Sequence, residues 1–222
     1  MKTKIHQYAP IFNTLRTHLL IIVLVAVTVS VQAQTNFEKG MSKAFELWQA
    51  DKTDQAEHMF ERIAKAESNA WLPHYYIAQL NSLKSWNVKD EAVLKAQLDK
   101  AQTHLDTAMA LSENNAELLV MQAQVYTNWV AFDGMTYGMK YSSKITELYA
   151  KAYAIDASNP RVAFGKAEWA MGSAKYFGQD TTPYCKAIEA SILLFDTFKA
   201  ESDLHPSWGK ERAKVVAASC KK

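Results

Sequence analysis

The sequence has few of the residues that interrupt helices, and few cysteines. Only seven Gly, five Pro and two Cys occur among its 222 residues. So little Gly and Pro argues against a turn-rich sandwich or barrel and favours a helical chain. Two Cys cannot supply a tetrathiolate zinc site. With 49% hydrophobic residues, the chain is long and apolar enough to bury the core of one ordinary domain.

Acidic residues are absent from the start of the chain, where the first one is Glu38. Before it, a basic stretch leads into an uncharged, mostly aliphatic run, Leu19–Val29, and then to Val31-Gln32-Ala33. This order is typical of a secretory signal peptide with an A-x-A-like cleavage site. We therefore expect residues 1–33 to be a signal peptide and residues 34–222 to be the mature domain. The alternative is a membrane anchor, but the run would span only about 17 Å of a core about 30 Å thick.

The basic character of the chain belongs to this leader. It holds three of the 25 basic residues and none of the 23 acidic ones, so the remaining chain carries 22 basic and 23 acidic side chains. A mature protein with this balance is a poor candidate for binding nucleic acid or anionic lipid through its overall charge. We expect a periplasmic or secreted protein with no nucleic-acid partner and no stable membrane anchor after cleavage.

A pattern of small and apolar residues recurs every 44 or 45 residues. Its four copies are Ala56-x3-Phe60-x2-Ile63, Ala101-x3-Leu105-x2-Ala108, Ile145-x3-Tyr149-x2-Ala152 and Ala190-x3-Leu194-x2-Thr197. Fifteen residues after each of the first three comes an alanine, at Ala78, Ala123 and Ala167. A small residue at matched depth in successive helices allows their backbones to approach closely. The pattern therefore predicts a series of stacked helical hairpins.

These spacings resemble the tetratricopeptide repeat (TPR), whose pattern is W-x2-L-G-x2-Y, then A-x3-F, then P. The best match is Tyr149-Ala-Lys-Ala152-Tyr-Ala-Ile155-Asp156-Ala-Ser-Asn159-Pro160, and the resemblance covers residues 36–219. The period is longer than the usual ~34 residues, and the Trp and Leu-Gly of the first helix are mostly replaced. The alternative is a plain helical bundle whose self-similarity is accidental.

The resemblance implies an all-α fold: a right-handed TPR-like α-solenoid of about four helical hairpins plus a C-terminal capping helix, in an exported protein of a Gram-negative bacterium. A capping helix is needed because the last repeat otherwise exposes an apolar face. We expect helices over 36–50, 54–67, 70–84, 90–111, 115–131, 140–156, 160–175, 183–200 and 206–219.

No catalytic or metal-binding motif stands out. The sequence has no G-x-S-x-G, no phosphate-binding glycine loop and no His-Glu-x-x-His. His74 and His104 fall in neighbouring expected helices, but we can nominate no third or fourth ligand to complete a metal site. We therefore expect no enzyme activity, no cofactor and no metal.

The two cysteines, Cys185 and Cys220, lie in the eighth expected helix and at the end of the last one. Export would carry both into an oxidising compartment, where an even number of thiols favours disulfide formation. We expect one intramolecular disulfide between them. Two buried free thiols or an intermolecular bridge are the alternatives.

TPR-like stacks commonly hold a peptide or a partner helix on a concave surface lined by the first helix of each hairpin. By register with the three alanines, the candidate groove residues are Phe45, Trp48, Tyr75, Gln79, Gln124, Asn128, Phe164 and Glu168. Aromatic rings and side-chain amides of this kind can hold an extended backbone. The expected function is therefore a non-catalytic scaffold that binds a protein or peptide partner in this groove. For each aromatic residue, packing between helices is the alternative role.

Two segments between the expected helices are rich in aromatics and glycine: Trp129–Tyr141 and Lys175–Tyr184. Such segments can simply fill gaps at hairpin tips, or they can bind a ligand. The alternative function is accordingly a periplasmic solute-binding protein or enzyme that uses these segments as a pocket.

Overall fold

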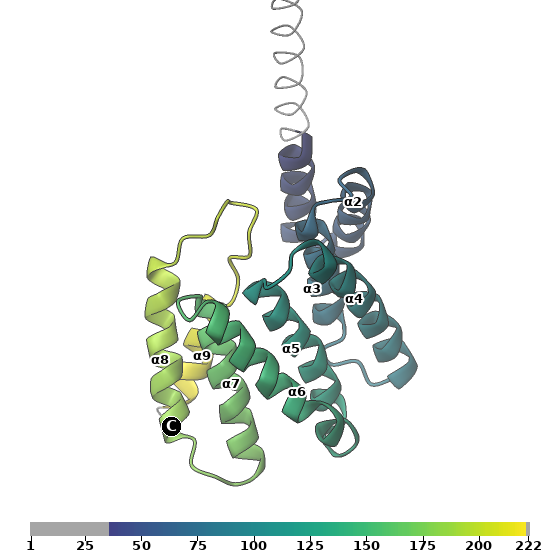
Figure 1. Cartoon of the computed structure of the whole chain (residues 1–222). Coiled ribbons are helices and arrows are strands. Elements are labelled where there is room, and N and C mark those ends of the chain that lie inside the picture. The colour runs from purple at the N-terminus through teal and green to yellow at the C-terminus, as the bar shows by residue number, and fades with distance from the viewer. Residues whose placement is uncertain (1–35, 221–222) are drawn as a thin grey trace, which may run out of the picture.

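The computed structural model describes residues 36–220, and the expected signal peptide lies outside the described residues. The described part is all-α (Figure 1): no strand occurs between residues 36 and 220. A helix over residues 36–49 comes first. It is followed by α2 (Thr53–Ala66), α3 (Trp71–Lys84), α4 (Glu91–Leu111), α5 (Ala116–Phe132), α6 (Gly134–Ile155), α7 (Pro160–Tyr176), α8 (Thr182–Thr197) and α9 (Lys210–Ser219). No helix in this part is both long and apolar enough to cross a bilayer.

The helices form antiparallel hairpins that stack side by side (Figure 1). Each helix packs on the next along the chain, and α5 also contacts both α3 and α7. The alanines at which we expect close packing, Ala78, Ala123 and Ala167, are all buried. Small side chains at these positions let α3, α5 and α7 approach one another. The stack of hairpins therefore has the order that the repeat predicts.

The repeated pattern is buried in three of its four copies. Phe60, Leu105 and Tyr149 are core residues, as are the small or aliphatic residues three positions later. In the fourth copy, Ala190 and Thr197 are exposed, because no further hairpin follows α8. The core on this side comes instead from α9, whose Ala213, Val216 and Ala217 pack with Ile188 of α8.

The helices α4 to α7 each start after an asparagine or aspartate side chain that binds free backbone N–H groups. Asn115 accepts a hydrogen bond from the amide of Glu117 at α5, and Asn159 accepts one from Arg161 at α7. At α6, Asp133 accepts from the amides of both Met135 and Thr136. This cap starts α6 at Gly134 rather than at residue 140, so the aromatic segment expected to be a loop is helical on both sides of Asp133.

The last helix begins later than expected, at Lys210 instead of residue 206. Gly209 precedes it with φ of +110°, a conformation that side chains with a Cβ rarely adopt. The segment between α8 and α9, residues 198–209, has no regular secondary structure. In Figure 1 it leaves the end of α8, rises above the hairpins and returns to α9. We call it the α8–α9 segment.

The predicted disulfide is confirmed: Cys185 is bonded to Cys220, with 5.9 Å between their Cα atoms. The bond joins the first turns of α8 to the residue that ends α9. It therefore fastens the ten-residue capping helix to the last hairpin.

Candidate functional site

The structure buries half of the residues expected to line a groove. Tyr75, Gln79, Asn128 and Phe164 are between 0% and 7% exposed. For these four side chains the prediction of an open groove is wrong, since a partner cannot reach them. Phe45, Trp48, Gln124 and Glu168 are half-buried, and binding by these four stays a prediction.

The reason is that the C-terminal part of the chain covers the face formed by the first helices. Trp208, in the α8–α9 segment, donates its indole N–H to the hydroxyl of Tyr75 at 2.7 Å. The hydroxyl of the neighbouring Tyr76 donates to the carbonyl of Leu204 at 2.7 Å. Phe164 packs in one cluster with residues of α9. The chain's own C-terminal part therefore covers the side of α3 and α7 on which Tyr75 and Phe164 lie.

Four of the groove candidates, two of them aromatic, also make specific contacts within the fold. Phe45 and Trp48 pack edge-on against Tyr76, with ring centroids 4.7 and 6.3 Å away. The side-chain amide of Asn128 donates to Ser82 and Ser85 at 2.7–2.9 Å, which ties α5 to the end of α3. Glu168 accepts hydrogen bonds from Arg212 of α9. These contacts explain the residues as parts of helix–helix packing.

The structure brings His74 and His104 together across α3 and α4, with 2.9 Å between their Nδ1 atoms. Burial lowers the pKa of both imidazoles. Among residues 36–220, however, no cluster of three or more His, Cys, Asp or Glu side chains could hold a metal ion. The pair is best described as one imidazole donating a hydrogen bond to the other.

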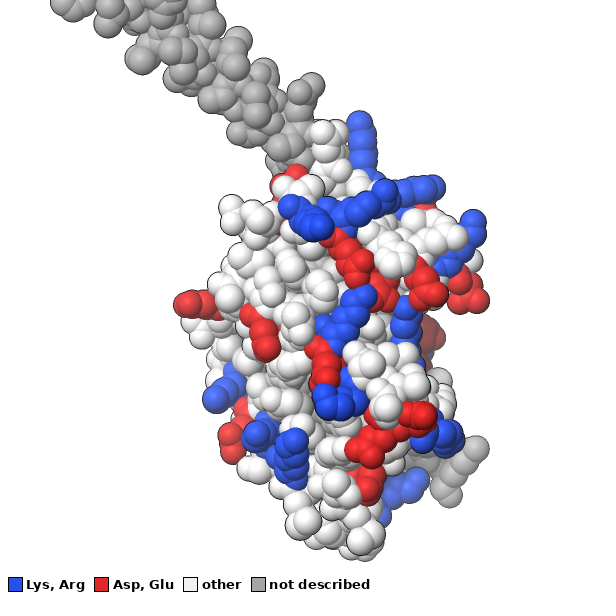
Figure 2. Space-filling model, turned by 90° about the vertical axis from the view of Figure 1, so that its right-hand side faces the viewer, with Lys and Arg blue, Asp and Glu red and all other residues white. Residues whose placement is uncertain are grey.

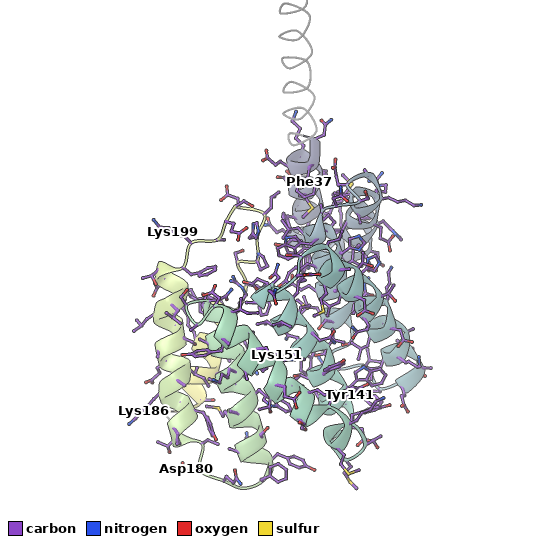
Figure 3. The ribbon with its side chains drawn as sticks, viewed as in Figure 1. Phe37, Tyr141, Lys151, Asp180, Lys186 and Lys199 are labelled. Carbon is purple, nitrogen blue, oxygen red and sulfur yellow. A yellow bond between two sulfur atoms is a disulfide. The ribbon has the colours of Figure 1, made fainter. Side chains whose placement is uncertain are left out.

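A pocket lined by aromatic rings lies between α4 and α6, with α5 forming its floor. Its volume is about 340 Å³, and we call it the aromatic pocket. Its lining residues are Glu91, Lys95, Leu98, Asp99 and Gln102 of α4, Tyr126 and Trp129 of α5, and Tyr137, Lys140 and Tyr141 of α6. Figure 3 labels Tyr141, which lies on the first half of α6. Residues of Trp129–Tyr141, one of the two aromatic segments noted in the sequence, line this pocket.

The rings of this pocket form a stack. Tyr126 lies 4.6 Å from Tyr141 with 15° between their planes, and Tyr137 lies 6.2 Å from Tyr141 with 17°. Trp129 is tilted against Tyr137, with centroids 4.7 Å apart. Tyr137 and Tyr141 share a face of α6 because they are four residues apart. Three phenol planes are therefore nearly parallel along one side of the pocket.

Charged side chains surround the stack. The Lys140 ammonium lies 4.9 Å from the centre of the Tyr141 ring. Lys95 pairs with Asp99 on α4, and the hydroxyl of Tyr137 donates to the carboxylate of Glu91. The hydrogen bond to Glu91 raises the pKa of Tyr137 to about 12. The phenol of Tyr137 is thus protonated near neutral pH.

The sequence did not indicate that residues of α4 line the aromatic pocket. Lys95, Asp99 and Gln102 follow one another at helical spacing on a single face of α4. That spacing is common on solvated helix faces, so it does not mark a site. Only the packing of α4 beside α6 makes it one wall of a pocket.

A larger pocket of about 740 Å³ opens at the other end of the hairpins, among the turns that precede α5 and α7. The α8–α9 segment lines it with Phe198 and His205, and Trp71 of α3 packs edge-on against the His205 ring, with ring centroids 5.6 Å apart. Arg161 lies in this pocket, but its guanidinium is bound to Glu117, with Nε 2.8–2.9 Å from the carboxylate oxygens. We call this the turn pocket.

Comparison with known proteins gives a fold match and no sequence match. No family model matches the chain, and no curated protein sequence matches it. Among solved structures, the chain is similar to the HusA haemophore from Porphyromonas gingivalis. The TM-score is 0.72 at 20% identity, and the alignment covers 83% of this chain and 92% of the haemophore. At this identity the similarity shows a shared all-helical fold.

Proposed function

We propose that this chain is an exported, non-catalytic binding protein whose ligand is a flat aromatic carboxylate of the porphyrin class, held in the aromatic pocket. The observation that carries the proposal is the stack of Tyr126, Tyr141 and Tyr137 along that pocket. As part of the same proposal, the stacked hairpins are TPR-like repeats whose concave face is covered by the chain's own C-terminal part.

The ring geometry suits a planar ligand. Aromatic rings attract one another most strongly in offset stacks and edge-to-face pairs. The nearly parallel phenols of the aromatic pocket already stack on one another, so a planar ligand would extend this stack at its outer ring and meet the tilted Trp129. Leu98 adds apolar surface from α4. A flat macrocycle would bury more of these ring surfaces than a flexible chain of equal size.

The charges suit carboxylate groups on such a ligand. Lys140 has no ion-pair partner among residues 36–220, and Lys95 needs only to turn from Asp99. Charge-assisted hydrogen bonds from ammonium to carboxylate are stronger than neutral ones. The two lysines lie on α6 and α4, on opposite walls of the aromatic pocket. They can therefore bind two carboxylates at the edge of one ligand.

The pocket offers little for binding an iron atom at the centre of a porphyrin. Iron in haem is ligated by His, Cys, Met or Tyr, and the aromatic pocket is lined by none of the first three. The hydrogen bond to Glu91 raises the pKa of Tyr137 to about 12. Because iron binds the phenolate form, this shift disfavours Tyr137 as an iron ligand. Stacking and charge therefore dominate the proposed binding, and the porphyrin without iron should also bind.

The similar fold of a protein named a haemophore supports this ligand class, because a haemophore carries haem. A peptide ligand in the expected groove receives less support, since four of the eight candidate residues are buried.

The proposal is tested by titrating the mature protein with haemin and with metal-free protoporphyrin, following the porphyrin absorbance band. We expect both to bind with similar affinity. Tyr141→Ala should weaken both by on the order of tenfold, as loss of a stacking ring does. Tyr153→Ala, at a half-exposed tyrosine of the same helix outside the pocket, is the matched control and should change neither.

Two results would overturn the proposal. One is a lack of porphyrin binding by the mature protein. The other is binding that survives Tyr141→Ala but is lost in Trp71→Ala or His205→Ala, because these two residues line the turn pocket instead.

A further inference from the structure

Four large apolar side chains stand free at one end of the molecule. Met135 is 80% exposed, Met139 92%, Tyr176 68% and Phe177 71%. Scattered exposed hydrophobic residues are normal on a protein surface, but a contiguous group of them indicates an interaction site. We call these four residues the apolar tip.

The four residues come from two neighbouring hairpin ends. The methionines lie in the first two turns of α6, and the aromatics lie where α7 ends. The two ends touch, since a Cβ on Gly134 would lie 3.8 Å from the ring of Tyr176. In Figure 1 both connections, α5–α6 and α7–α8, lie at the lower end of the molecule, and Figure 3 labels Asp180 there. The space-filling view in Figure 2 shows an uncharged surface at this lower end.

Lysines border the apolar tip. Lys140 follows Met139, Lys175 precedes Tyr176, and both are exposed. Two nearby carboxylates accept hydrogen bonds from backbone amides. Asp133 accepts them from Met135 and Thr136, and Asp180 accepts one from Thr182. Both carboxylates thus face the positive end of a helix, which offsets their charge. The two lysines therefore supply positive groups beside the apolar side chains, next to two aspartates whose charge is offset in part and to Glu91, which accepts from Tyr137.

This combination fits a lipid surface better than a protein. A methionine side chain that is 92% exposed makes almost no contact that would fix its position, so it can adapt to a fluid surface. Flexible apolar side chains can enter the boundary between headgroups and acyl chains, with an aromatic ring at headgroup level. Each nearby lysine adds attraction to anionic lipids.

We propose that the apolar tip, with Lys140 and Lys175 beside it, docks the protein reversibly on the surface of an anionic lipid bilayer. The docking is peripheral and needs no membrane-spanning segment. It rests on the exposed side chains and their charges alone, and it stands whether or not the aromatic pocket binds a porphyrin.

The test is cosedimentation of the mature protein, without porphyrin, with vesicles of phosphatidylcholine or of phosphatidylcholine mixed with phosphatidylglycerol. We expect binding to the anionic vesicles that weakens as salt is raised. The double variant Met139→Asp, Phe177→Asp should reduce this binding by on the order of tenfold or more. The matched control is Leu193→Asp, Val215→Asp, which places the same charges on side chains that are 68% and 62% exposed on α8 and α9. Helical circular dichroism should be unchanged in both variants.

Reversing the charges of the two lysines tests the electrostatic contribution to vesicle binding. Lys140→Glu, Lys175→Glu should lower binding to the mixed vesicles on the order of tenfold while leaving binding to phosphatidylcholine unchanged. The proposal is overturned if the protein binds neither vesicle, if the tip variant and its control bind equally, or if the tip instead joins two copies of the chain, seen as a dimer in solution that the tip variant abolishes.

Discussion

The sequence predicts that Tyr75 binds a partner, but in the structure Tyr75 is a core residue. Its side chain is 0% exposed, and it lies among Trp71, Tyr76 and Trp208. A buried hydroxyl requires a hydrogen-bond partner, and the indole of Trp208 provides one. Truncating Tyr75 would therefore remove a ring from the core and leave the indole N–H of Trp208 without its acceptor. A loss of stability, and not of ligand binding alone, is the expected effect of such a change.

Glu57 is a buried charged residue with three polar partners. Its carboxylate accepts hydrogen bonds from Lys84 and Asn81 at 2.6 and 2.9 Å and also pairs with Lys100. Burial alone would raise the pKa of Glu57, but the hydrogen bonds from Lys100, Lys84 and Asn81 outweigh it and lower the pKa from 4.5 to about 2. The network joins α2 to α3 and α4.

This shift predicts a particular loss of stability in acid. A carboxyl group whose pKa is lower in the folded chain stabilises the fold above its unfolded pKa of 4.5, and this contribution disappears as the pH falls through about 2. Urea unfolding should show wild-type protein more stable than Glu57→Gln at neutral pH, by a difference that shrinks between pH 4.5 and about 2. Glu46→Gln, at an exposed carboxylate paired with Lys43, is the control and should change the free energy of unfolding little, because exposed ion pairs contribute little. A difference independent of pH would contradict the assignment.

Among the elements, α9 depends most on its attachments. It has ten residues, and an isolated helix of that length is marginal in water. Its buried residues Ala213, Val216 and Ala217 are small, so the apolar area that holds it is limited. The disulfide between Cys185 and Cys220 supplies the remaining constraint.

Removing that bond should therefore loosen the end of the stack. In the chain-entropy model, a closed loop of this size contributes about 3–4 kcal/mol. We expect the double variant Cys185→Ser, Cys220→Ser to lose roughly this free energy of unfolding in urea. Amide hydrogen exchange should accelerate in α9 and much less in α3, which is buried at the centre of the main core. Reduced wild-type protein is the control and should behave like the variant; a loss below about 1 kcal/mol would show that packing alone holds α9.

At the scale of the whole molecule, we predict where the signal peptide is cleaved. The expected signal peptide ends in Val31-Gln32-Ala33. We expect cleavage after Ala33, so that mass spectrometry of the native protein finds Gln34 as the first residue. Ala33→Arg, which places a large charged residue at the cleavage site, should leave the leader attached. Detection of residues 1–33 on the native wild-type protein would contradict the prediction.

The sequence by itself determined the all-α class, the order of the helices and most of their bounds, but not the starts of α6 and α9. These features are local or nearly so: hairpins form between adjacent segments, and the burial of Ala78, Ala123 and Ala167 follows from their helical spacing. The sequence favoured a bond between Cys185 and Cys220 but left free thiols and an intermolecular bridge open, and the structure confirms the intramolecular bond.

Only the tertiary structure decided which surfaces stay open. The covering of Tyr75 by Trp208 joins residues that are 133 positions apart, through a segment without regular structure. Helical periodicity says which side of a helix is apolar, but it does not say which distant segment will cover that side. In the same way, the tyrosines of α6 become part of a pocket only because α4 lies beside them with Lys95 and Gln102. The position of a binding site on this stack depends on contacts between distant parts of the chain, which local spacing does not determine.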